Sequence, residues 1–509
     1  MKIKYIIFAF IVVGLLFRVV QYQHALFSDW DEGIYAEVAA DMVERNSYIL
    51  PEFNSQPWLD KPPVVGMLIA GAFKLFPEHK ELASRATMAF VAIGLLAFLY
   101  ILSKRITTFF FAEKLNSLSE WMRELVFFSP LFATALTPVF LDRAIRLNTD
   151  SLLAVSWLGY FVARESFQGK FAAIIIGTWT KSVAGFYPMV FDIFSFFTLK
   201  NKTKNIGLYI ALIVSGFSWL ILNYFVYGHD FIKAHIQDQL FKRVTVPIEL
   251  HFGGRLFYPE FLVKELSFVL VIMICSYLII TFDILKKLRP ENGISFFKKL
   301  TSFIQSPSCA LYVLLLSPLP FFVLLTFAKS KIWWYMILII PFFALSIPYG
   351  LMRVRNNTLR MIVAISIFAF FLFRFLPATY ALKTVQDSPD KLRVAQCVGS
   401  IPSDRVLIMV NEQERKNRNV VEAAQLQTYS SFMYGGAPSF VYYAHKKVEH
   451  YYRVEELNGR LISGGTMKDL LVISKDDMIK DEFSEARKAL LSKKKETTCY
   501  FGEWEVYQL

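Results

Sequence analysis

Long apolar runs alternate with short polar loops over the first three quarters of this 509-residue chain. Most of the runs approach the ~20 residues that a helix needs to cross the ~30 Å hydrocarbon core of a bilayer. They predict a polytopic α-helical membrane protein with about 11–13 transmembrane helices. The predicted spans lie at about residues 5–27, 82–103, 124–141, 150–164, 170–180, 183–199, 206–227, 261–284, 309–327, 332–350 and 359–378.

One apolar segment, at residues 63–76, is short, and it tests the topology. If it crossed the membrane, the basic pair Lys104 and Arg105 would face outward and every later loop would invert. Because cytoplasmic loops collect Lys and Arg, the segment is predicted to be an interfacial helix. This places the N-terminus inside and the C-terminus outside, with the acids, aromatics and isolated cations in the outer loops.

The composition changes after Ala378. Residues 380–509 alternate strand-like runs (VLIMV, FVYYA, DLLVIS and EWEVYQL) with helix-like ones. This predicts a soluble, extracytoplasmic α/β domain behind a transmembrane domain at residues 1–379. The domain carries no nucleotide-binding or catalytic motif, so an accessory role is favoured. Cys397 and Cys499 lie in it, and their pairing depends on whether it is extracytoplasmic.

Composition and charge narrow the function class. Hydrophobic residues make up 55% of the chain and charged residues only 19%, as membrane spans require. The formal net charge of +13 suggests nucleic acid at first sight, but basic cytoplasmic loops explain it better. The four cysteines have no metal-ligand spacing, so they predict no cysteine-based metal site.

The first extracytoplasmic loop, residues 28–61, opens with SDWDEGIYAE. Apolar residues at helical spacing predict a helix that Ser28 or Asp29 caps. Asp31 and Glu32 then fall in its first turn, where carboxylates favour the helix dipole. From these acids alone, that structural explanation is slightly favoured over a functional one.

The same loop ends in WLDKPPVVG, where two prolines stiffen the chain beside Asp60 and Lys61. Later outer loops carry cations, among them a lone Lys181 between apolar runs, which is costly without a partner. Together these groups are expected to surround a space suited to a phosphate on a lipid. Carboxylates beside cations indicate group transfer, in which an acid activates a hydroxyl and cations stabilise a departing phosphate. The outer-loop groups are Arg143, Arg146, Asp150, Lys181, Lys329, Lys331 and Tyr335.

DEGIYAEVAADM followed by WLDKPPVVGML resembles the first extracytoplasmic loop of GT-C-type membrane glycosyltransferases. The nearest group is that of the bacterial aminoarabinose transferase and the dolichyl-phosphate-mannose protein mannosyltransferases. Later segments follow in the family's order: RAIRLNTDSLL, TWTKSVAG, DQLFKRV with HFGGRLFYPEFL, and KSKIWWYMILIIP. The chain departs from the family at Asp60, where Glu is frequent, at Ser182, where Gly is usual, and at Gln239, where some members have a metal-binding His.

The resemblance implies an inverting glycosyltransferase of the inner cell membrane, with an extracytoplasmic site. It would move a monosaccharide from a polyprenyl-phosphate donor, such as undecaprenyl phosphate, to lipid A, a glycan or a protein of the cell envelope. Membrane lipids are further partners, and no nucleic acid is expected.

The resemblance also distributes roles among the residues. Asp31 is expected to be the catalytic carboxylate with Glu32 in reserve, and Asp60 to position Lys61 or a cation. Asp31 and Asp60 are also candidate ligands of a divalent Mg²⁺ or Mn²⁺. Asp29 is left as a cap or a solvent-facing group. The donor-binding residues implied are Tyr35, Lys61, Arg143, Arg146, Asp150, Lys181, Arg243, Lys331 and Tyr335.

A transporter or flippase of a lipid-linked sugar is the alternative. It would share the topology and the cations but would not need Asp31 for chemistry. Repeat-related, discontinuous helices would support it, and the sequence has no convincing internal repeat.

Overall fold

The computed structural model describes residues 3–163, 166–196, 202–290, 295–380, 390–428, 433–462, 469–493 and 496–509. The chain forms two compact units. The first, called the helical unit, comprises Met1–Gln21, Arg85–Val226 and Phe252–Lys383. The second, called the mixed unit, comprises Tyr22–Ser84, Tyr227–His251 and Thr384–Leu509. The predicted fold class, a helical membrane protein with a small C-terminal α/β part, is confirmed.

The mixed unit joins the first predicted outer loop and part of the long loop to the C-terminal residues. Sequence composition predicts a different division, between residues 379 and 380. That boundary adjoins residues 381–389, which lie outside the described residues, and it stays a prediction.

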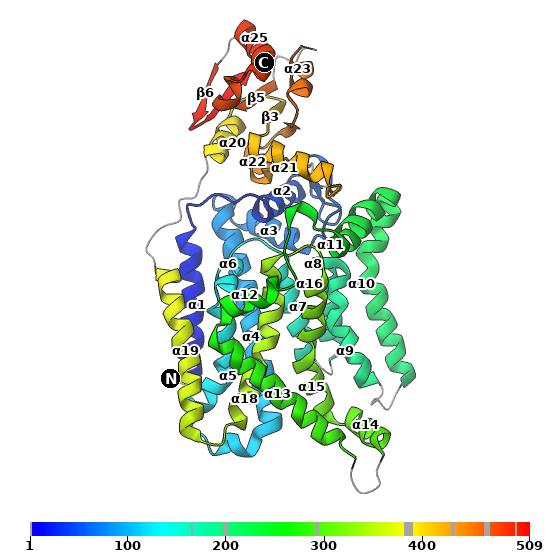
Figure 1. Ribbon diagram of the computed structural model, residues 1–509. Coiled ribbons are helices and arrows are strands. Elements are labelled where there is room, and N and C mark those ends of the chain that lie inside the picture. Colours follow the sequence, from blue (N-terminus) through cyan, green and yellow to red (C-terminus); the bar gives the residue numbers. More distant parts are fainter. Residues whose placement is uncertain are drawn as a thin grey trace. The chain divides into compact units, whose positions relative to one another are not determined.

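The helical unit consists of helices. Helix α4 (Lys80–Asn116) begins in the mixed unit, and helix α10 (Lys202–Phe231) ends there. Within the unit, α13 (Phe268–Leu288) packs on α18 (Ser346–Arg353) (Figure 1). Helix α5 (Glu120–Ala135) packs on α17 (Met336–Ala344), α18 and α19 (Asn357–Tyr380). The helices are α1 (Ile3–Gln21), α4 (Lys80–Asn116), α5 (Glu120–Ala135), α6 (Pro138–Arg143), α7 (Asp150–Ala163), α8 (Phe167–Lys181), η1 (Ser182–Phe186), α9 (Tyr187–Phe196), α10 (Lys202–Phe231), α12 (Phe257–Leu266), α13 (Phe268–Leu288), α14 (Phe296–Ile304), α15 (Pro307–Leu316), α16 (Pro318–Phe327), η4 (Trp333–Tyr335), α17 (Met336–Ala344), α18 (Ser346–Arg353) and α19 (Asn357–Tyr380).

Within the described residues, seven helical stretches are long and apolar enough to cross a membrane. They are Lys4–Gln21, Lys80–Asn116, Ile206–Thr245, Phe268–Leu288, Pro307–Phe327, Trp333–Arg353 and Asn357–Arg374, and each overlaps a predicted span. The other four predicted spans fall on the shorter helices α5 with α6, α7, α8 and α9. The chain is therefore a multi-pass membrane protein.

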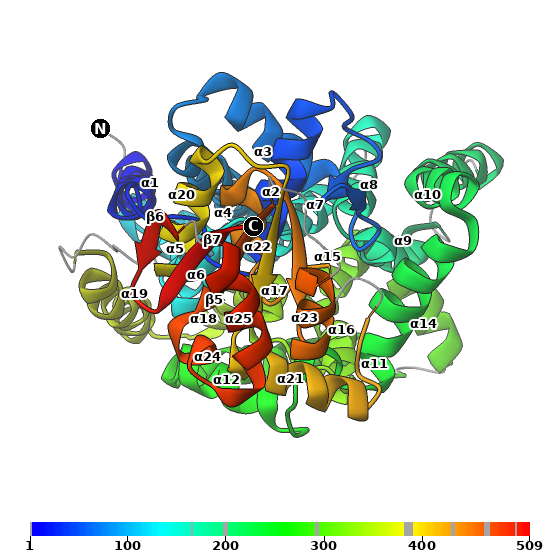
Figure 2. The same ribbon diagram turned by 90° about the horizontal axis from the view of Figure 1, so that it is seen from above.

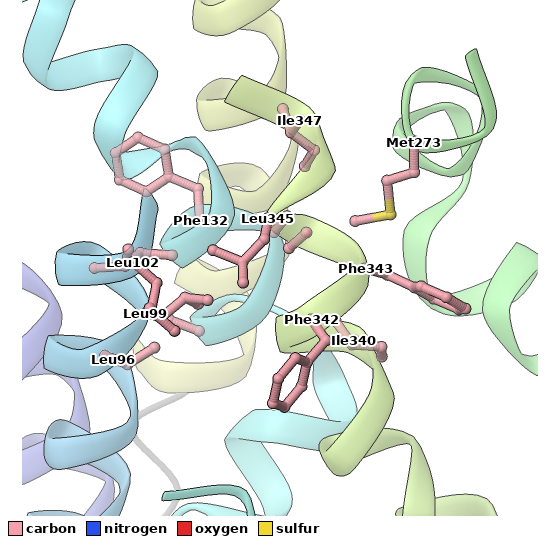
Figure 3. Packing of buried hydrophobic residues seen from close by; sticks show 14 of the residues in the cluster. Leu96, Leu99, Leu102, Phe132, Met273, Ile340, Phe342, Phe343, Leu345 and Ile347 are labelled. Atoms are coloured by element: carbon pink, nitrogen blue, oxygen red, sulfur yellow. The ribbon is translucent and has the colours of Figure 1, made fainter. Parts of the chain in front are cut away.

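The core of the helical unit is built around α17 and α18. All nine residues of α17 are buried, as expected of a helix that is apolar all round. In Figure 3, Leu345 lies toward Leu99 and Phe132, which come from α4 and α5. Phe343 points to the side where Met273 of α13 lies. Neighbouring helices therefore enclose this segment with apolar side chains.

The mixed unit contains both helices and strands. The element η2 (Ile232–Lys242) is a π-helix. The predicted interfacial helix is α3 (Val64–Leu75). Its 12 residues give a length of about 18 Å, which is too short to cross the core of a bilayer. The elements are α2 (Asp31–Glu44), β1 (Glu52–Phe53), β2 (Gln56–Pro57), α3 (Val64–Leu75), η2 (Ile232–Lys242), α11 (Arg243–Thr245), η3 (Ile248–Leu250), α20 (Asp390–Ser400), β3 (Arg405–Met409), α21 (Glu412–Ala423), α22 (Pro438–Ala444), β4 (Lys447–Tyr451), α23 (Val454–Ile462), β5 (Asp469–Ser474), α24 (Lys475–Met478), η5 (Asp481–Phe483), α25 (Ser484–Lys493), β6 (Glu496–Phe501) and β7 (Trp504–Gln508).

A five-stranded sheet with strand order β4-β3-β5-β7-β6 organises the C-terminal residues. Strand β3 is parallel to β4 and β5, whereas β7 is antiparallel to β5 and β6. Helices α23 and α25 cover one face, where Leu457 and Ala486 pack with Leu407 and Leu471 of the strands. Figure 2 shows α25 beside β5 and β7. Buried central strands explain the near-continuous apolar runs in the sequence.

Three of the four predicted strands are confirmed, because VLIMV, DLLVIS and EWEVYQL correspond to β3, β5 and β7. The prediction for FVYYA is wrong, since this run lies in the helix α22. A short apolar run has no periodicity that separates a strand from a buried helix. All seven residues of α22 are buried, and Pro438 stands at the helix start, where its missing N–H costs nothing.

Cys397 of α20 and Cys499 of β6 form a disulfide, which answers the question that the sequence leaves open. Their Cα atoms lie 5.8 Å apart, and the two cysteines are 102 positions apart in sequence. The bond therefore links the first helix of the C-terminal residues to an edge strand of the sheet.

Replacement of both cysteines, Cys397→Ser with Cys499→Ser, is expected to lower the free energy of unfolding by about 2–4 kcal/mol, because the bond restricts the unfolded chain. Scanning fluorimetry of the purified protein, with and without reductant, measures the change. Cys275→Ser with Cys309→Ser, at two cysteines outside the disulfide, should leave the response to reductant unchanged. A wild-type protein whose melting is insensitive to reductant would contradict the prediction.

Candidate functional site

The predicted site residues divide evenly between the two units, and within each unit several of them come together. The mixed unit holds Asp31, Glu32, Tyr35, Asp60, Lys61 and Arg243. The helical unit holds Arg143, Arg146, Asp150, Lys181, Lys331 and Tyr335.

Asp31 is the first residue of α2, and the turn before it is not the predicted one. The N-cap is Trp30, at φ 67°, and it makes no side-chain cap bond, so the prediction of a Ser28 or Asp29 cap is wrong. Glu32 instead accepts hydrogen bonds at Oε2 from Ser28 N at 3.0 Å and Ser28 Oγ at 2.9 Å. Glu32 is buried, and its carboxylate holds the turn that leads into the helix.

Asp29 ties the first loop to the start of α22. Its Oδ1 accepts a hydrogen bond from Ser439 N at 3.2 Å. The Ser439 hydroxyl in turn donates to Ser28 O at 2.7 Å. Burial raises the pKa of Asp29, and the nearby Lys391 offsets part of that rise. Asp29 is therefore an anchor between two segments of the mixed unit.

A chain of buried hydrogen bonds holds Asp60. Trp58 Nε1 donates to Tyr434 Oη at 2.8 Å, and Tyr434 Oη donates to Asp60 Oδ2 at 2.5 Å. Asp60 is only 5% exposed, and a buried carboxylate is costly unless it is hydrogen-bonded. Tyr35, one helical turn beyond Asp31, packs edge-on against Trp58 with ring centroids 5.7 Å apart. The start of α2 is thereby connected to the Asp60 segment.

Lys61 and Arg243 meet at one side chain of the π-helix η2. Lys61 Nζ donates to Gln239 Oε1 at 2.7 Å, and Arg243 Nε donates to the same oxygen at 2.9 Å. Arg243 also pairs with Glu249 at 3.2 Å. The π-helical geometry is rare and is frequent at functional sites. Two cations therefore share one uncharged acceptor, an arrangement that suits the binding of an anion.

His235 lies on the same π-helix, against the peptide that precedes Asp60. Its Nδ1 is 3.1 Å from Leu59 O, and its ring stacks on Phe231 with centroids 5.3 Å apart. Burial, followed by the positive charge of Lys61, lowers the pKa of His235 to about 3. The imidazole is therefore neutral near pH 7 and supports the backbone next to Asp60.

In the helical unit, Asp150, Lys181 and Tyr335 come together. Asp150 begins α7 and forms an ion pair with Lys181, the last residue of α8. The Lys181 ammonium also lies 4.1 Å from the centroid of the Tyr335 ring. Asp150 is buried, so the pair satisfies both the acid and the lysine between apolar runs.

Arg143 and Arg146 share Asp142. Arg143 Nε lies 3.3 Å and Arg146 Nε 2.8 Å from its carboxylate oxygens. The Arg143 guanidinium also lies 5.1 Å from the ring centroid of Trp333 and 4.2 Å from that of Trp334. Cation–π contacts at these distances are attractive, and they hold Arg143 in one position.

Lys331 is buried against the end of α16. Its Nζ donates to Leu325 O at 3.0 Å and to Thr326 O at 2.6 Å. The last carbonyls of a helix lack intrahelical partners and favour a cation. Burial lowers the pKa of Lys331, and the charge of Lys329 lowers it further. A structural role at the helix end therefore accompanies the phosphate-binding role predicted for this residue.

The metal prediction depends on two carboxylates. Among the described residues, no three His, Cys, Asp or Glu side chains gather as metal ligands. Lys61 and Arg243 already bring positive charge next to the Asp60 segment. Binding of Mg²⁺ or Mn²⁺ by Asp31 and Asp60 stays a prediction.

Sequence reasoning missed Tyr434 and His235. Tyr434 is 374 positions from Asp60, and no spacing rule connects them. The only local signal is the following Gly435–Gly436 pair, at φ 60° and 70°, because such a turn indicates a closely fitted backbone. His235 precedes Gln239 by one helical turn and carried no separate signal.

Glu37 of α2 offers a pH test of the mixed unit. Burial, followed by the charge of Asp41, raises the pKa of Glu37 to about 7. The folded state therefore retains the Glu37 proton at higher pH than the unfolded chain does. The contribution of the protonated Glu37 to folding stability is complete below about pH 4.5 and is lost as the pH rises through 7. Wild-type stability should fall by up to about 1.4 kcal/mol per pH unit in this window from this group.

Glu37→Gln should narrow the difference in melting temperature between pH 5 and pH 8, measured by scanning fluorimetry in one detergent. Glu78→Gln is the control, because Glu78 is exposed in the same unit. An unchanged difference in Glu37→Gln would contradict the prediction.

Comparison with known proteins adds to this geometry. No family model matches the chain. It is 22% identical over 229 residues to an uncharacterized protein of Aquifex aeolicus, a match that covers 42% of each chain. It is 23% identical over 287 residues to a second such protein, covering 55% of this chain and 64% of that one. The matches thus span less than two thirds of either relative.

Two solved structures are similar over nearly the whole length. The crystal structure of ArnT from Cupriavidus metallidurans bound to undecaprenyl phosphate has a TM-score of 0.62 at 12% identity, covering 99% of this chain and 97% of that one. The apo state of the same protein has a TM-score of 0.60 at 13% identity, with the same coverage. At this identity the likeness shows the fold, and the chain has the GT-C-type fold that its first-loop motifs predict.

Proposed function

We propose that the chain is a membrane glycosyltransferase with a lipid-phosphate-linked sugar donor. One observation carries the proposal: Lys61 and Arg243 meet at Gln239 Oε1, and Lys61 directly follows the buried Asp60. Cations beside carboxylates suit a reaction in which a phosphate departs and an acceptor is activated. The fold supports the same reading, because the similar ArnT structure contains undecaprenyl phosphate.

The donor is a polyprenyl-phosphate monosaccharide, with its phosphate on Lys61 and Arg243. Gln239 Oε1 is uncharged, so a phosphate oxygen that replaces it gives stronger, charge-assisted hydrogen bonds to both cations. The π-helix sets the position of Gln239 and begins the segment that Arg243 continues. The two cations are therefore arranged before the donor arrives.

Asp31 acts on the acceptor. In the proposed step, Asp31 takes the proton of an acceptor hydroxyl while the hydroxyl oxygen bonds to the anomeric carbon. The bond from that carbon to the phosphate oxygen breaks, and the phosphate leaves with the electron pair, which Lys61 and Arg243 stabilise. A single displacement inverts the anomeric configuration. An acceptor phosphate, as on lipid A, would not need Asp31 as a base.

The remaining acids of the first loop have supporting roles. Asp60 positions Lys61, its neighbour in sequence, and Tyr35 shapes the sugar pocket from the second turn of α2. Glu32 stays in reserve as a catalytic group, because its bonds to Ser28 already give it a structural task. The reaction as written has no metal step, and a divalent ion on Asp31 and Asp60 would add charge to the same region.

In the helical unit we assign donor contacts to the residues around Trp333–Tyr335. Arg143 and Lys181 are held against aromatic rings, so their positions are set in advance. Asp150 orients Lys181, and Tyr335 offers a ring face to a sugar. Arg146 and Lys331 are further donor contacts, and at all four cations a ligand has to compete with an existing partner.

The acceptor is a glycolipid, glycan or protein on the extracytoplasmic side that the loop charges predict, at the inner cell membrane that the family resemblance implies. The disulfide between Cys397 and Cys499 supports this side, because disulfides persist in oxidising compartments.

Lys61→Ala and Arg243→Ala should each weaken binding of undecaprenyl phosphate about 10–100-fold, the loss expected for a hydrogen bond to a charged group. Binding to the purified protein in nanodiscs is measured by thermophoresis. Lys242→Ala is the matched control, because Lys242 adjoins Arg243 but bonds to Gln427 O and Asp238. Equal affinity in all four proteins would remove the phosphate site from Lys61 and Arg243.

Asp31→Asn should lower transfer about 10²–10⁴-fold, the range for loss of a general base, while binding of undecaprenyl phosphate is retained. Mass spectrometry of envelope lipids and glycans, from cells with the wild-type gene, the variant gene and no gene, identifies the product and measures it. Absence of any gene-dependent glycosylated product, despite binding of the lipid phosphate, would favour the transporter alternative instead.

A further inference from the structure

Tyr434 connects the C-terminal residues to the carboxylate of Asp60. We propose that Tyr434 is a positioning residue for the reaction, acting through Asp60 and so on Lys61. This inference rests on the proposed function, and it assigns a task in the chemistry to the C-terminal part, for which the sequence favours an accessory role.

The hydroxyl of Tyr434 has a fixed proton direction. An indole N–H can only donate, so the bond from Trp58 Nε1 uses a lone pair of the Tyr434 oxygen. The hydroxyl proton is then directed to Asp60 Oδ2 at 2.5 Å. Because Oδ2 has to accept, the bond favours the ionised carboxylate and fixes its side-chain torsion.

The surroundings keep Tyr434 in this role. Its ring packs edge-on against Phe53 of β1, with centroids 5.1 Å apart. Burial, followed by the charge of Asp60, raises the pKa of Tyr434 well above its usual value, so the hydroxyl stays a donor. Gly435 and Gly436 follow at positive φ, and a Cβ on Gly435 would collide with the His450 ring. The backbone turn thus leaves the ring little freedom.

Further contacts hold residues 433–451, the Tyr434 segment, against residues 22–84 of the mixed unit. Tyr443 Oη donates to Glu81 Oε1 at 2.8 Å and accepts from Phe27 N at 2.7 Å. Asn54 Nδ2 donates to Val448 O at 2.8 Å, and its Oδ1 accepts from Val448 N at 2.9 Å. These contacts do not involve Asp60, so loss of the Tyr434 hydroxyl need not release the segment.

Tyr434→Phe removes the hydroxyl and keeps the ring. It should lower kcat about 10-fold or more, the effect of removing a hydrogen bond to a charged group, with the KM for the donor changed about 2-fold or less. Tyr443→Phe is the matched control, because it removes a buried hydroxyl from the same segment away from Asp60, and it should retain wild-type kcat. An equal loss in both variants, or none in Tyr434→Phe, would overturn the inference.

A double-mutant cycle separates positioning from general support. In the Asp60→Asn background, Tyr434→Phe should change kcat about 2-fold or less, because the carboxylate through which it acts is gone. If the loss of kcat in the double variant equals the product of the two single losses, Tyr434 acts independently of Asp60, and the proposal is overturned.

Hydrogen exchange gives a readout without activity. Backbone amides of residues 58–61 should exchange faster in Tyr434→Phe than in wild type and Tyr443→Phe, in purified protein in nanodiscs. Unchanged exchange would overturn the positioning role even if no transfer were found. A wild-type protein without transfer activity, but with this exchange difference, would instead contradict the proposed function alone.

Discussion

A carboxylate that is buried away from water needs a hydrogen-bond donor, and Tyr434 supplies one to Asp60. The side chain of Asp60 is 5% exposed, and the Tyr434 hydroxyl, itself held by Trp58, donates to it. A buried unpaired charge costs several kcal/mol, so this short chain of bonds constrains everything attached to it. The double proline after Lys61 adds stiffness to the same segment. Asp60 and Tyr434 both belong to the mixed unit, which joins residues 22–84 to the C-terminal ones.

The same rule explains the ionisable groups of the helical unit. Asp150 and Lys181 pair with each other, and the ammonium also faces the Tyr335 ring. Lys331 finds its acceptors at the end of a helix, where carbonyls lack partners. Each of these charges therefore has a local structural task. A residue with such a task can also bind a ligand, but the ligand then has to replace the existing partner. The residues whose present partners hold them most weakly are therefore the best candidates for ligand binding.

The sequence predicted what depends on local order. Apolar runs located the helices of the helical unit, and the helical spacing around Ile34 and Val38 located α2. The sequence predicted the wrong N-cap for α2. The turn before the helix is held by hydrogen bonds from Ser28 to the Glu32 carboxylate, and the side chain at the N-cap makes no cap bond. The sequence also predicted a strand where α22 lies, since a fully buried apolar run loses its periodicity.

Partners that are distant in sequence could not be predicted. Motif resemblance pointed to Asp60 and Lys61, but nothing in the spacing of residues connects them to Tyr434 or Gln239. These contacts depend on tertiary packing of segments more than 170 positions apart, as the separation of 178 between Lys61 and Gln239 shows. The sequence therefore predicted individual residues of the candidate site but not the hydrogen bonds that hold them in position.

Gln239 shows how one departure from a family pattern changes the chemistry of a position. A His there offers a ring nitrogen to a metal, whereas an amide oxygen is a poor zinc ligand and a good acceptor for cationic donors. In this chain both Lys61 and Arg243 donate to that oxygen. The neighbouring His235 is neutral, because burial and the charge of Lys61 lower its pKa to about 3. Lys61 and Arg243, rather than a protonated His235, thus supply the positive charge beside Asp60. A phosphate that displaces the Gln239 oxygen would meet two cations already directed toward one point.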